Sequence, residues 1–388
     1  MSEEVWTVKR ALDWVRGYLE RKGDGNPRVS SEWLLSEVCG LSRMGLYLNP
    51  ERPLDRAELD VLHDYVIRRG KGEPLQYITG EAPFRHLVVK VRPGVLIPRP
   101  ETEVLVSEAL ACLPAAAKRE ARWNAEAFEQ EAAAVADLKA RIAAAHAEMG
   151  EDVADPGEGG EGDAVRQAAA EGRDAERGLP EEGTATAAAD SADVGDPVPA
   201  DGAAGAPTPA GSAQPSEGFL LVADICTGTG CIACSIASER PDARVIAVDL
   251  APEAVSLARD NADELGLSDK VKVLQGDLGG PIPKRYLGRF DLVVSNPPYI
   301  PTEVLDVMPR EVADFEPELA LDGGADGLDL FRRLVPWARL ALKPGGAFAC
   351  ELHETCLDAA AAIARAAGFD QASIVDDLAG RPRVLVCR

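Results

Sequence analysis

The sequence predicts an α/β protein whose carboxyl-terminal half folds into a doubly wound, mostly parallel sheet, preceded by a small helical domain. From residue 219 onward, apolar segments typical of buried strands alternate with amphipathic helical segments. Polar or glycine-rich turns follow four successive strands, and in such sheets ligands bind at the carboxyl ends of the strands. In residues 1–80, by contrast, apolar residues recur at helical spacing.

The sequence of the first 113 residues predicts a helical domain followed by a linking segment. Residues 1–80 form a helical domain, which could serve as a docking surface for a substrate or as scaffold. One of its helices begins with Asp55 followed by Glu58, the pattern of a capping box. Alternating apolar residues flanked by glycines predict a hairpin within residues 70–91. Residues 81–113 are therefore expected to form a hairpin linker and the start of the catalytic domain.

Residues 114–218 interrupt this pattern with an acidic segment rich in alanine, glycine and proline. It holds 22 acidic and 8 basic residues, a net charge of −14. Residues 115–149 could form one solvated helix, whereas residues 150–218 have too few large apolar side chains to form a core. We therefore expect a largely disordered insertion that serves as a tolerated spacer.

Residues 219–388 predict the catalytic domain. The expected strands are Leu220–Ile225, Arg244–Asp249, Val271–Gln275, Phe290–Ser295, Ala347–Leu352, Ser373–Val375 and Arg383–Cys387. The expected helices are Cys231–Glu239, Pro252–Leu265, Asp329–Leu342 and Leu357–Ala367, with a turn at residues 343–346.

Charge and cysteine usage exclude several classes of protein. Of the net charge of −24, the insertion carries −14, which leaves −10 for the rest of the chain. That balance lacks the basic stripe of a protein that binds nucleic acid unaided. No signal peptide or membrane-spanning run is present, and the eight cysteines are scattered, so a reduced cytoplasmic protein is expected.

A glycine-rich turn follows the first strand of the sheet, in the segment Asp224–Gly230. Glycines in this position let a ligand approach the backbone, and the following helix amino terminus favours polar ligand groups. Asp249 ends the second strand about 20 residues later and suits hydrogen bonds to ribose hydroxyls; the alternative is a helix cap. After the third strand, Asp277 is placed to contact an adenine edge and Leu278 to cover its face.

The fourth strand ends in Ser295-Asn296-Pro297-Pro298-Tyr299-Ile300. The two prolines make a stiff turn that places the Asn296 carboxamide at the ligand-binding edge, with Tyr299 as a flat face beside it. A carboxamide can orient another planar nitrogen group. The alternative is an ordinary proline turn, but a nucleoside site beside a pocket for a planar nitrogen suggests group transfer onto that nitrogen.

These residues resemble a known class of enzyme. Residues 219–388 resemble the class I S-adenosylmethionine-dependent methyltransferases, which have a seven-stranded Rossmann-like sheet. Three motifs narrow the resemblance: Gly72–Gly80 (GEPLQYITG), Ile97–Glu103 (IPRPETE) and Ser295–Ile300 (SNPPYI). With them, and with the ending Gly380–Val384, the chain outside residues 114–218 is similar to the protein-(glutamine-N5) methyltransferases that modify class-I peptide chain release factors.

The resemblance implies a cofactor, a substrate and a set of site residues. The cofactor is S-adenosyl-L-methionine, and the substrate is the glutamine of the Gly-Gly-Gln motif of a class-I release factor. Cofactor contacts are expected from Cys226, Thr227, Gly228, Thr229, Gly230, Asp249, Asp277, Leu278 and Asn296. Asn296, Pro297, Pro298 and Tyr299 would hold the glutamine amide, with Asn296, Pro297 and Tyr299 as the catalytic residues. The family usually has glycine at the position of Cys226 and often tryptophan or phenylalanine near Leu278.

Several alternatives stay open at this point. The same Asn-Pro-Pro-Tyr motif serves enzymes that methylate an exocyclic nitrogen of a flipped nucleobase. Glutamine methylation of a ribosomal protein and a non-catalytic cofactor-binding or docking role are the others. Cys226, Cys231 and Cys234 match part of an iron–sulfur spacing, although core packing explains them better. The four histidines are not clustered, so no metal site is expected.

Overall fold

A seven-stranded sheet organises the carboxyl-terminal half of the chain, in the order β5-β4-β3-β6-β7-β9-β8. The computed structural model describes residues 5–115, 132–133, 136–137, 140 and 219–388. The strands are β3 (Leu220–Ile225), β4 (Ala243–Asp249), β5 (Val271–Gln275), β6 (Phe290–Ser295), β7 (Leu342–Glu351), β8 (Ala372–Asp376) and β9 (Pro382–Cys387). The first five are parallel, and β9 runs antiparallel to both β7 and β8.

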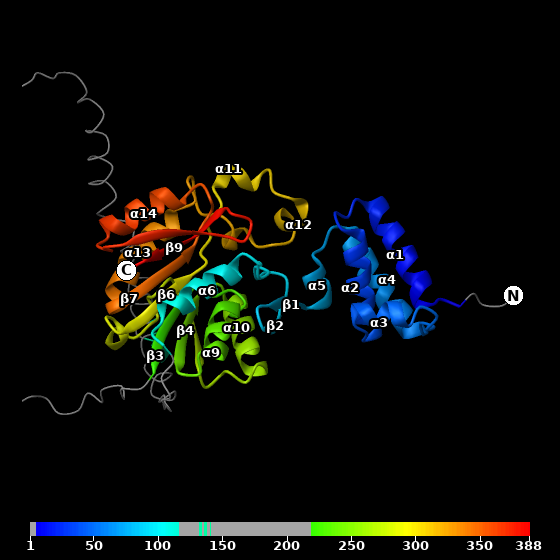
Figure 1. Cartoon of the computed structure of the whole chain (residues 1–388), viewed down its shortest axis with the longest axis horizontal. Coiled ribbons are helices and arrows are strands. Elements are labelled where there is room, and N and C mark those ends of the chain that lie inside the picture. The colour runs from blue at the N-terminus through cyan, green and yellow to red at the C-terminus, as the bar shows by residue number, and fades with distance from the viewer. Residues whose placement is uncertain (1–4, 116–131, 134–135, 138–139, 141–218) are drawn as a thin grey trace, which may run out of the picture. The chain divides into compact units, whose positions relative to one another are not determined.

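Helices cover both faces of the sheet, as expected for a doubly wound fold (Figure 1). On one face lie α6 (Thr102–Cys112), α9 (Cys231–Glu239) and α10 (Pro252–Glu264), and on the other α13 (Asp329–Ala341) and α14 (Leu357–Ala366). Between β6 and α13 the chain forms the short helices α11 (Thr302–Leu305) and α12 (Arg310–Ala313) and a 3₁₀ turn at Glu318–Ala320; another 3₁₀ turn spans Lys284–Tyr286. The predicted fold class is confirmed.

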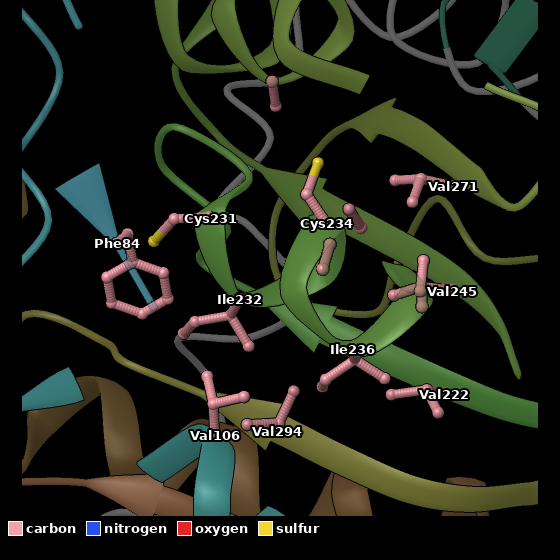
Figure 2. Packing of buried hydrophobic residues seen from close by; sticks show 14 of the residues in the cluster. Phe84, Val106, Val222, Cys231, Ile232, Cys234, Ile236, Val245, Val271 and Val294 are labelled. Atoms are coloured by element: carbon pink, nitrogen blue, oxygen red, sulfur yellow. The ribbon is translucent and has the colours of Figure 1, made fainter. Parts of the chain in front are cut away.

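The core on the α9 face explains two of the cysteines. Cys231 and Cys234 are buried among aliphatic side chains from β3, β4, β5 and β6, and their sulfur atoms point in different directions (Figure 2). Cysteine behaves in such surroundings as a small apolar residue. The geometry supports the core-packing interpretation of these cysteines rather than the iron–sulfur alternative.

The amino-terminal helices have a hydrophobic core of their own. They are α1 (Val8–Lys22), α2 (Pro27–Cys39), α3 (Arg43–Leu48), α4 (Arg56–Gly70) and α5 (Leu75–Thr79). Ala11, Val15 and Leu19 are fully buried at the spacing read from the sequence. At the start of α4 the Asp55 side chain accepts from the Glu58 amide and the Glu58 carboxylate accepts from the Asp55 amide, so the predicted capping box is present.

Two sequence-based expectations need correction. The hairpin expected within residues 70–91 is shorter, with β1 (Glu81–Phe84) paired to β2 (Leu87–Lys90), because α5 occupies part of the range. The turn expected at residues 343–346 belongs to β7, where the pairing with β6 shifts between Phe290 and Leu292. Gly345, at φ +78°, allows the strand to bulge there without ending.

Other expectations concern residues that the structure does not describe. The helix expected in residues 115–149 and the disorder expected up to residue 218 fall almost wholly outside the described residues. The four domain boundaries therefore stay predictions. Within the part of the chain that is described, no helix is both long enough and apolar enough to cross a membrane.

Candidate active site

A cleft of about 420 Å³ opens where β3, β4, β5 and β6 end. These strands are neighbours and run parallel, so the turns that follow them meet at one edge of the sheet. Seven predicted site residues line the cleft: Cys226, Gly228, Asp249, Asp277, Leu278, Asn296 and Pro298. The other five are not among the lining residues but belong to the turns that follow β3 and β6: Thr227, Thr229, Gly230, Pro297 and Tyr299.

The turn after β3 is built from left-handed backbone conformations. Cys226, Gly228 and Gly230 have φ values of +62°, +55° and +79°. A Cβ atom on Gly228 would meet no atom within 4 Å, whereas one on Gly230 would come within 3.1 Å of the Ala258 Cβ atom. Gly228 thus leaves open space along the backbone at the cleft, and Gly230 lets α9 pack closely on α10.

The backbone at position 226 has a conformation that favours glycine. Cys226 is one of three non-glycine residues with positive φ among those described, together with Arg85 and Leu278. A side chain in this conformation costs about 1–2 kcal/mol, because its Cβ atom crowds the backbone. Cys226 adopts this left-handed conformation although it carries a side chain.

Asp224 supports this turn from below and was absent from the predicted site. Its Oδ2 atom accepts the Thr227 hydroxyl at 2.6 Å and the Ala233 amide at 3.1 Å. The side chain is fully buried, and this loss of solvent raises the pKa of Asp224 to about 7. Its signal in the sequence was its place as the first residue of the Asp224–Gly230 segment.

Asp249 lies at the end of β4, with its carboxylate on the cleft. Its Oδ2 atom accepts the Gly228 amide at 2.8 Å, and its Oδ1 atom accepts the Ala251 amide at 3.0 Å. Burial raises the pKa of Asp249, and these backbone amides oppose the shift. Helix α10 begins after Ala251 without a side-chain cap, so the geometry does not support the helix-cap alternative for Asp249.

The turn after β5 brings Asp277 and Leu278 to the same cleft. Asp277 is about half exposed and forms an ion pair with Arg333 of α13. Leu278 packs against the core on the α13 face and has a φ of +46°. Both line the cleft, but the Asp277 carboxylate is shared with a cation that the sequence pattern had not indicated.

The turn after β6 holds Asn296 at the rim. Its Nδ2 atom donates to the Thr102 hydroxyl at 3.1 Å, across 194 positions of sequence. Tyr299 turns its hydroxyl inward and donates to Glu351 at 2.9 Å. Asn296 lies at the rim as expected, whereas Tyr299, expected as a flat face beside it, is not among the residues that line the cleft. Sequence reasoning missed Thr102 and Glu351, which hold the two side chains.

Two loops that sequence reasoning missed supply the remaining walls of the cleft. Gly94, Val95 and Leu96 lie on one side, and Pro317, Leu319 and Ala320 on another. An ion pair between Arg99 and Glu316, at 2.5 Å, joins the segments that carry these residues. Glu316 is buried, and this burial raises the pKa of its carboxyl group, with Arg99 opposing the shift.

The Asp322–Gly324 segment packs directly on the Asn-Pro-Pro-Tyr turn. The Ile300 amide donates to the Leu321 carbonyl at 2.9 Å, and the Gly323 amide returns a bond to the Ile300 carbonyl at 2.8 Å. A Cβ atom on Gly323 would lie 2.7 Å from the Tyr299 Cα atom. The glycine cluster in this part of the sequence was the signal that could have indicated close backbone contact.

The site shows no metal-binding arrangement. Among the residues that the structure describes, no group of three or more His, Cys, Asp or Glu side chains is placed to hold a metal ion. The polar groups on the cleft are instead carboxylates, a carboxamide and backbone amides. That set suits an organic ligand with hydroxyl, amine and ring-nitrogen groups.

Two family models match the chain. A methyltransferase domain matches residues 220–373, and the PrmC N-terminal domain matches residues 10–80. With the sheet order and the cleft at its carboxyl edge, the first match defines the class of the protein: a methyltransferase with a seven-stranded Rossmann-like sheet.

Curated relatives define the family. A release factor glutamine methyltransferase of Geobacter sulfurreducens is 35% identical over 90% of this chain and 85% of its own length. One of Moorella thermoacetica is 32% identical, covering 97% of this chain and 96% of the relative, and one of Caulobacter vibrioides is 29% identical over 98% and 96%. The chain belongs to the family of release factor glutamine methyltransferases.

Proposed function

We propose that this enzyme transfers the methyl group of S-adenosyl-L-methionine to the side-chain nitrogen (N5) of the glutamine in the Gly-Gly-Gln motif of class-I release factors. The observation that carries the proposal is the Asn296 carboxamide, fixed by Thr102 at the rim of a cleft with nucleoside-binding character. Release factors act in the cytoplasm, where we expect the enzyme as well. Its partner is a protein; we expect no direct contact with nucleic acid and none with a membrane.

The residues of the cleft fit the proposed cofactor. Asp249 keeps unused lone pairs on both carboxylate oxygens and is positioned for ribose hydroxyls. The open space beside Gly228 admits a ligand against the backbone, and Leu278 offers an apolar surface for a ring. For Asp277 we propose contact with the adenine edge, made while Arg333 continues to hold the other side of the carboxylate.

The protein contributes to the reaction mainly by holding and orienting the substrate amide. An amide nitrogen is a weak nucleophile because its lone pair is delocalised into the carbonyl group. We propose that the Asn296 Oδ1 atom and the Pro297 carbonyl accept its two hydrogens and keep the nitrogen in line with the methyl group. When bound, S-adenosyl-L-methionine supplies an electrophilic methyl on a sulfonium. The alkylated nitrogen would carry one proton too many and would lose it to solvent from beside the Asn296 or Pro297 oxygen, while the electron pair of the broken S–C bond would stay on sulfur.

Alignment of the amide nitrogen with the methyl group accounts for the lowering of the reaction barrier that this site can provide. Alignment of two reactants supplies several kcal/mol of the barrier in well-oriented systems. Tyr299, whose ring packs against the core and whose hydroxyl faces Glu351, contributes by fixing the turn. Its expected role as a flat face for the planar amide stays a proposal, because Tyr299 is not among the residues that line the cleft.

Asn296→Ala tests the proposal. Methyl transfer should fall at least about 100-fold, because the amide loses its acceptor, while cofactor affinity should change little. Labelled S-adenosyl-L-methionine is incubated with release factor, with ribosomal protein and with ribosomal RNA, and mass spectrometry locates the label. Gln371→Ala, at an exposed position, is the control. Label on ribosomal RNA or ribosomal protein but not on the Gly-Gly-Gln glutamine would overturn the proposed substrate.

A further inference from the structure

A chain of polar groups lies behind Asn296, away from the cleft. Thr102, the first residue of α6, accepts from Asn296, and Glu351, the last residue of β7, accepts from Tyr299. Thr102 is 2% exposed and Glu351 is 0% exposed. Neither lines the cleft, so neither is placed to touch a ligand there.

Burial of these polar groups lowers the stability of the fold. Burial raises the pKa of Glu351, and the hydroxyls of Thr102 and Tyr299, with the charge of Arg383, oppose that shift. The Oε2 atom of Glu351 has no hydrogen-bond partner among the described residues. A buried polar group that is only partly satisfied costs stability, which calls for an explanation beyond packing.

Helix capping does not explain Thr102. Threonine near a helix start commonly caps it by accepting a backbone amide hydrogen. In α6 the cap position is Glu101, and no side chain forms a capping bond. The Thr102 hydroxyl is instead directed to Asn296, in a turn 194 residues away.

The bond to Thr102 fixes which end of the carboxamide faces the cleft, provided that the Thr102 hydroxyl acts as the acceptor. A hydroxyl can also donate, but the Glu351 carboxylate attracts the Thr102 hydroxyl hydrogen and leaves the hydroxyl oxygen for Asn296. A carboxamide has a donor nitrogen on one arm and an acceptor oxygen on the other. With Nδ2 held by Thr102, the Oδ1 atom is left to accept from a substrate. If the carboxamide turned over, it would present N–H groups to a substrate amide that itself donates, and the two would repel each other.

We propose that Thr102 is a positioning residue that orients Asn296 as a hydrogen-bond acceptor, and that Glu351 anchors the arrangement through Tyr299. The inference rests on the proposed function, since it explains how the site selects a nitrogen that donates hydrogens. Thr102 and Glu351 thereby join the Ile97–Glu103 segment and strand β7 to the methyl-transfer site.

Thr102→Val removes the hydroxyl and keeps the shape of the side chain. We expect kcat for release-factor methylation to fall about 10- to 100-fold, as for loss of one orienting hydrogen bond. The dissociation constant of S-adenosyl-L-methionine should stay within about twofold. Thr102→Ser, which restores the hydroxyl, should recover kcat to within about threefold of wild type. Thr79→Val, which removes a hydroxyl bonded to the Leu75 carbonyl in α5, is the matched control.

Glu351→Gln separates positioning from chemistry. Glutamine keeps an acceptor oxygen for the Tyr299 hydroxyl but cannot take up a proton as a base. We expect kcat within about threefold of wild type, with an unchanged pH profile. A loss of more than about tenfold would mean that the carboxylate takes part in the reaction, and the positioning role would be wrong.

The outcomes distinguish this inference from the proposed function. If wild-type enzyme does not methylate the release-factor glutamine, the proposed function fails. If wild type is active and Thr102→Val has the same kcat, the inference on Thr102 is overturned. Should valine at position 102 prevent folding, Thr102→Ala takes its place, and recovery by serine decides as before.

Discussion

At the scale of single residues, the site depends on side chains whose roles are set by burial. Asp224 and Asp249 are both aspartates at the ends of neighbouring strands, and both have raised pKa values because they are buried. Asp249 reaches the cleft, whereas Asp224 faces Thr227 and the start of α9. Asp224 therefore supports the turn, and its ionisation should be visible in stability.

Stability should fall with rising pH on account of Asp224. Its pKa is about 7 when folded and 3.8 as the model value for the unfolded chain, so the folded state holds the proton more tightly. Between these values the free energy of unfolding should fall by roughly 1 kcal/mol per pH unit, and above pH 7 this contribution should level off. Urea unfolding at pH 5.5, 6.5 and 7.5 measures the slope.

Asp224→Asn isolates this contribution. The other buried carboxyl groups titrate in both proteins, so their effects cancel when the two pH profiles are subtracted. We expect wild type to lose stability relative to the variant from pH 5.5 to 7 and no further change above that range. Asp306→Asn, at an exposed position, should follow wild type. Parallel profiles for wild type and Asp224→Asn would show that Asp224 does not titrate in this range.

At the scale of secondary-structure elements, two helices are brought together by one glycine. Gly230 directly precedes α9 at φ +79°, and a Cβ atom there would lie 3.1 Å from the Cβ atom of Ala258 in α10. Packing α9 and α10 on one face of the sheet fixes the turn between β3 and α9, which forms part of the cleft wall. The close approach makes this position intolerant of any side chain.

Gly230→Ala should destabilise the protein more than a comparable change elsewhere. An added Cβ would lie 3.1 Å and 3.2 Å from the Cβ and Cα atoms of Ala258, in addition to the cost of a left-handed conformation. We expect a loss of at least about 2 kcal/mol in the free energy of unfolding. Gly266→Ala is the matched control: its φ is +67°, but no atom lies within 4 Å, so it should lose about 1 kcal/mol. Equal losses in urea titrations would contradict the packing argument.

Sequence reasoning located the strands well because their signal is local. For β3, β5 and β6 the predicted and observed bounds agree, since continuous apolar runs ended by glycine, aspartate or proline mark buried parallel strands. The segment from Pro301 to Leu328 was missed because short helices and turns there follow no apolar period. Its place over the site depends on glycine contacts and on the pair formed by Arg99 and Glu316.

At the site, too, only residues marked by a local sequence pattern could be predicted. Asn296, Asp249 and Gly228 could be found because each directly follows a strand, and the sheet brings strand ends together. Thr102 lies in the Ile97–Glu103 motif, but its partner, like those of Glu351 and Glu316, could not be predicted, since these partners lie between 52 and 217 positions away in the sequence. Such pairings are set by packing of the whole domain, which no local pattern encodes.

At the scale of the whole molecule, the site is built from elements on both sides of residues 116–218. Helix α6 ends at Cys112 and packs on α9, β7 and β9, and the sheet begins at Leu220. The cleft and the side chains that hold its residues belong to residues 94–102 and 226–351. Both sides of the insertion therefore contribute to one core, and the link between them has no residue in the site as described.

Replacing residues 116–218 with a glycine–serine linker should preserve methyl transfer. The deleted segment carries a net charge of −14, so the shortened protein has a net charge of −10. A linker of about fifteen residues can span up to roughly 50 Å, enough to cross a sheet of this size. We expect kcat and the dissociation constant of S-adenosyl-L-methionine within about twofold of wild type, measured with release factor as substrate.

Salt dependence separates an inert spacer from a functional one. Salt weakens attraction between exposed charges on two proteins. If the insertion only spaces the two halves, its charges do not attract the release factor, and the shortened protein and wild type should show the same salt dependence of KM for release factor. A linker of equal length that keeps the 22 acidic and 8 basic residues in scrambled order is the control. A rise in KM that the scrambled linker restores would assign the insertion an electrostatic role in substrate capture, and a loss that only the natural sequence restores would make it a specific binding segment. Either result would contradict the spacer prediction.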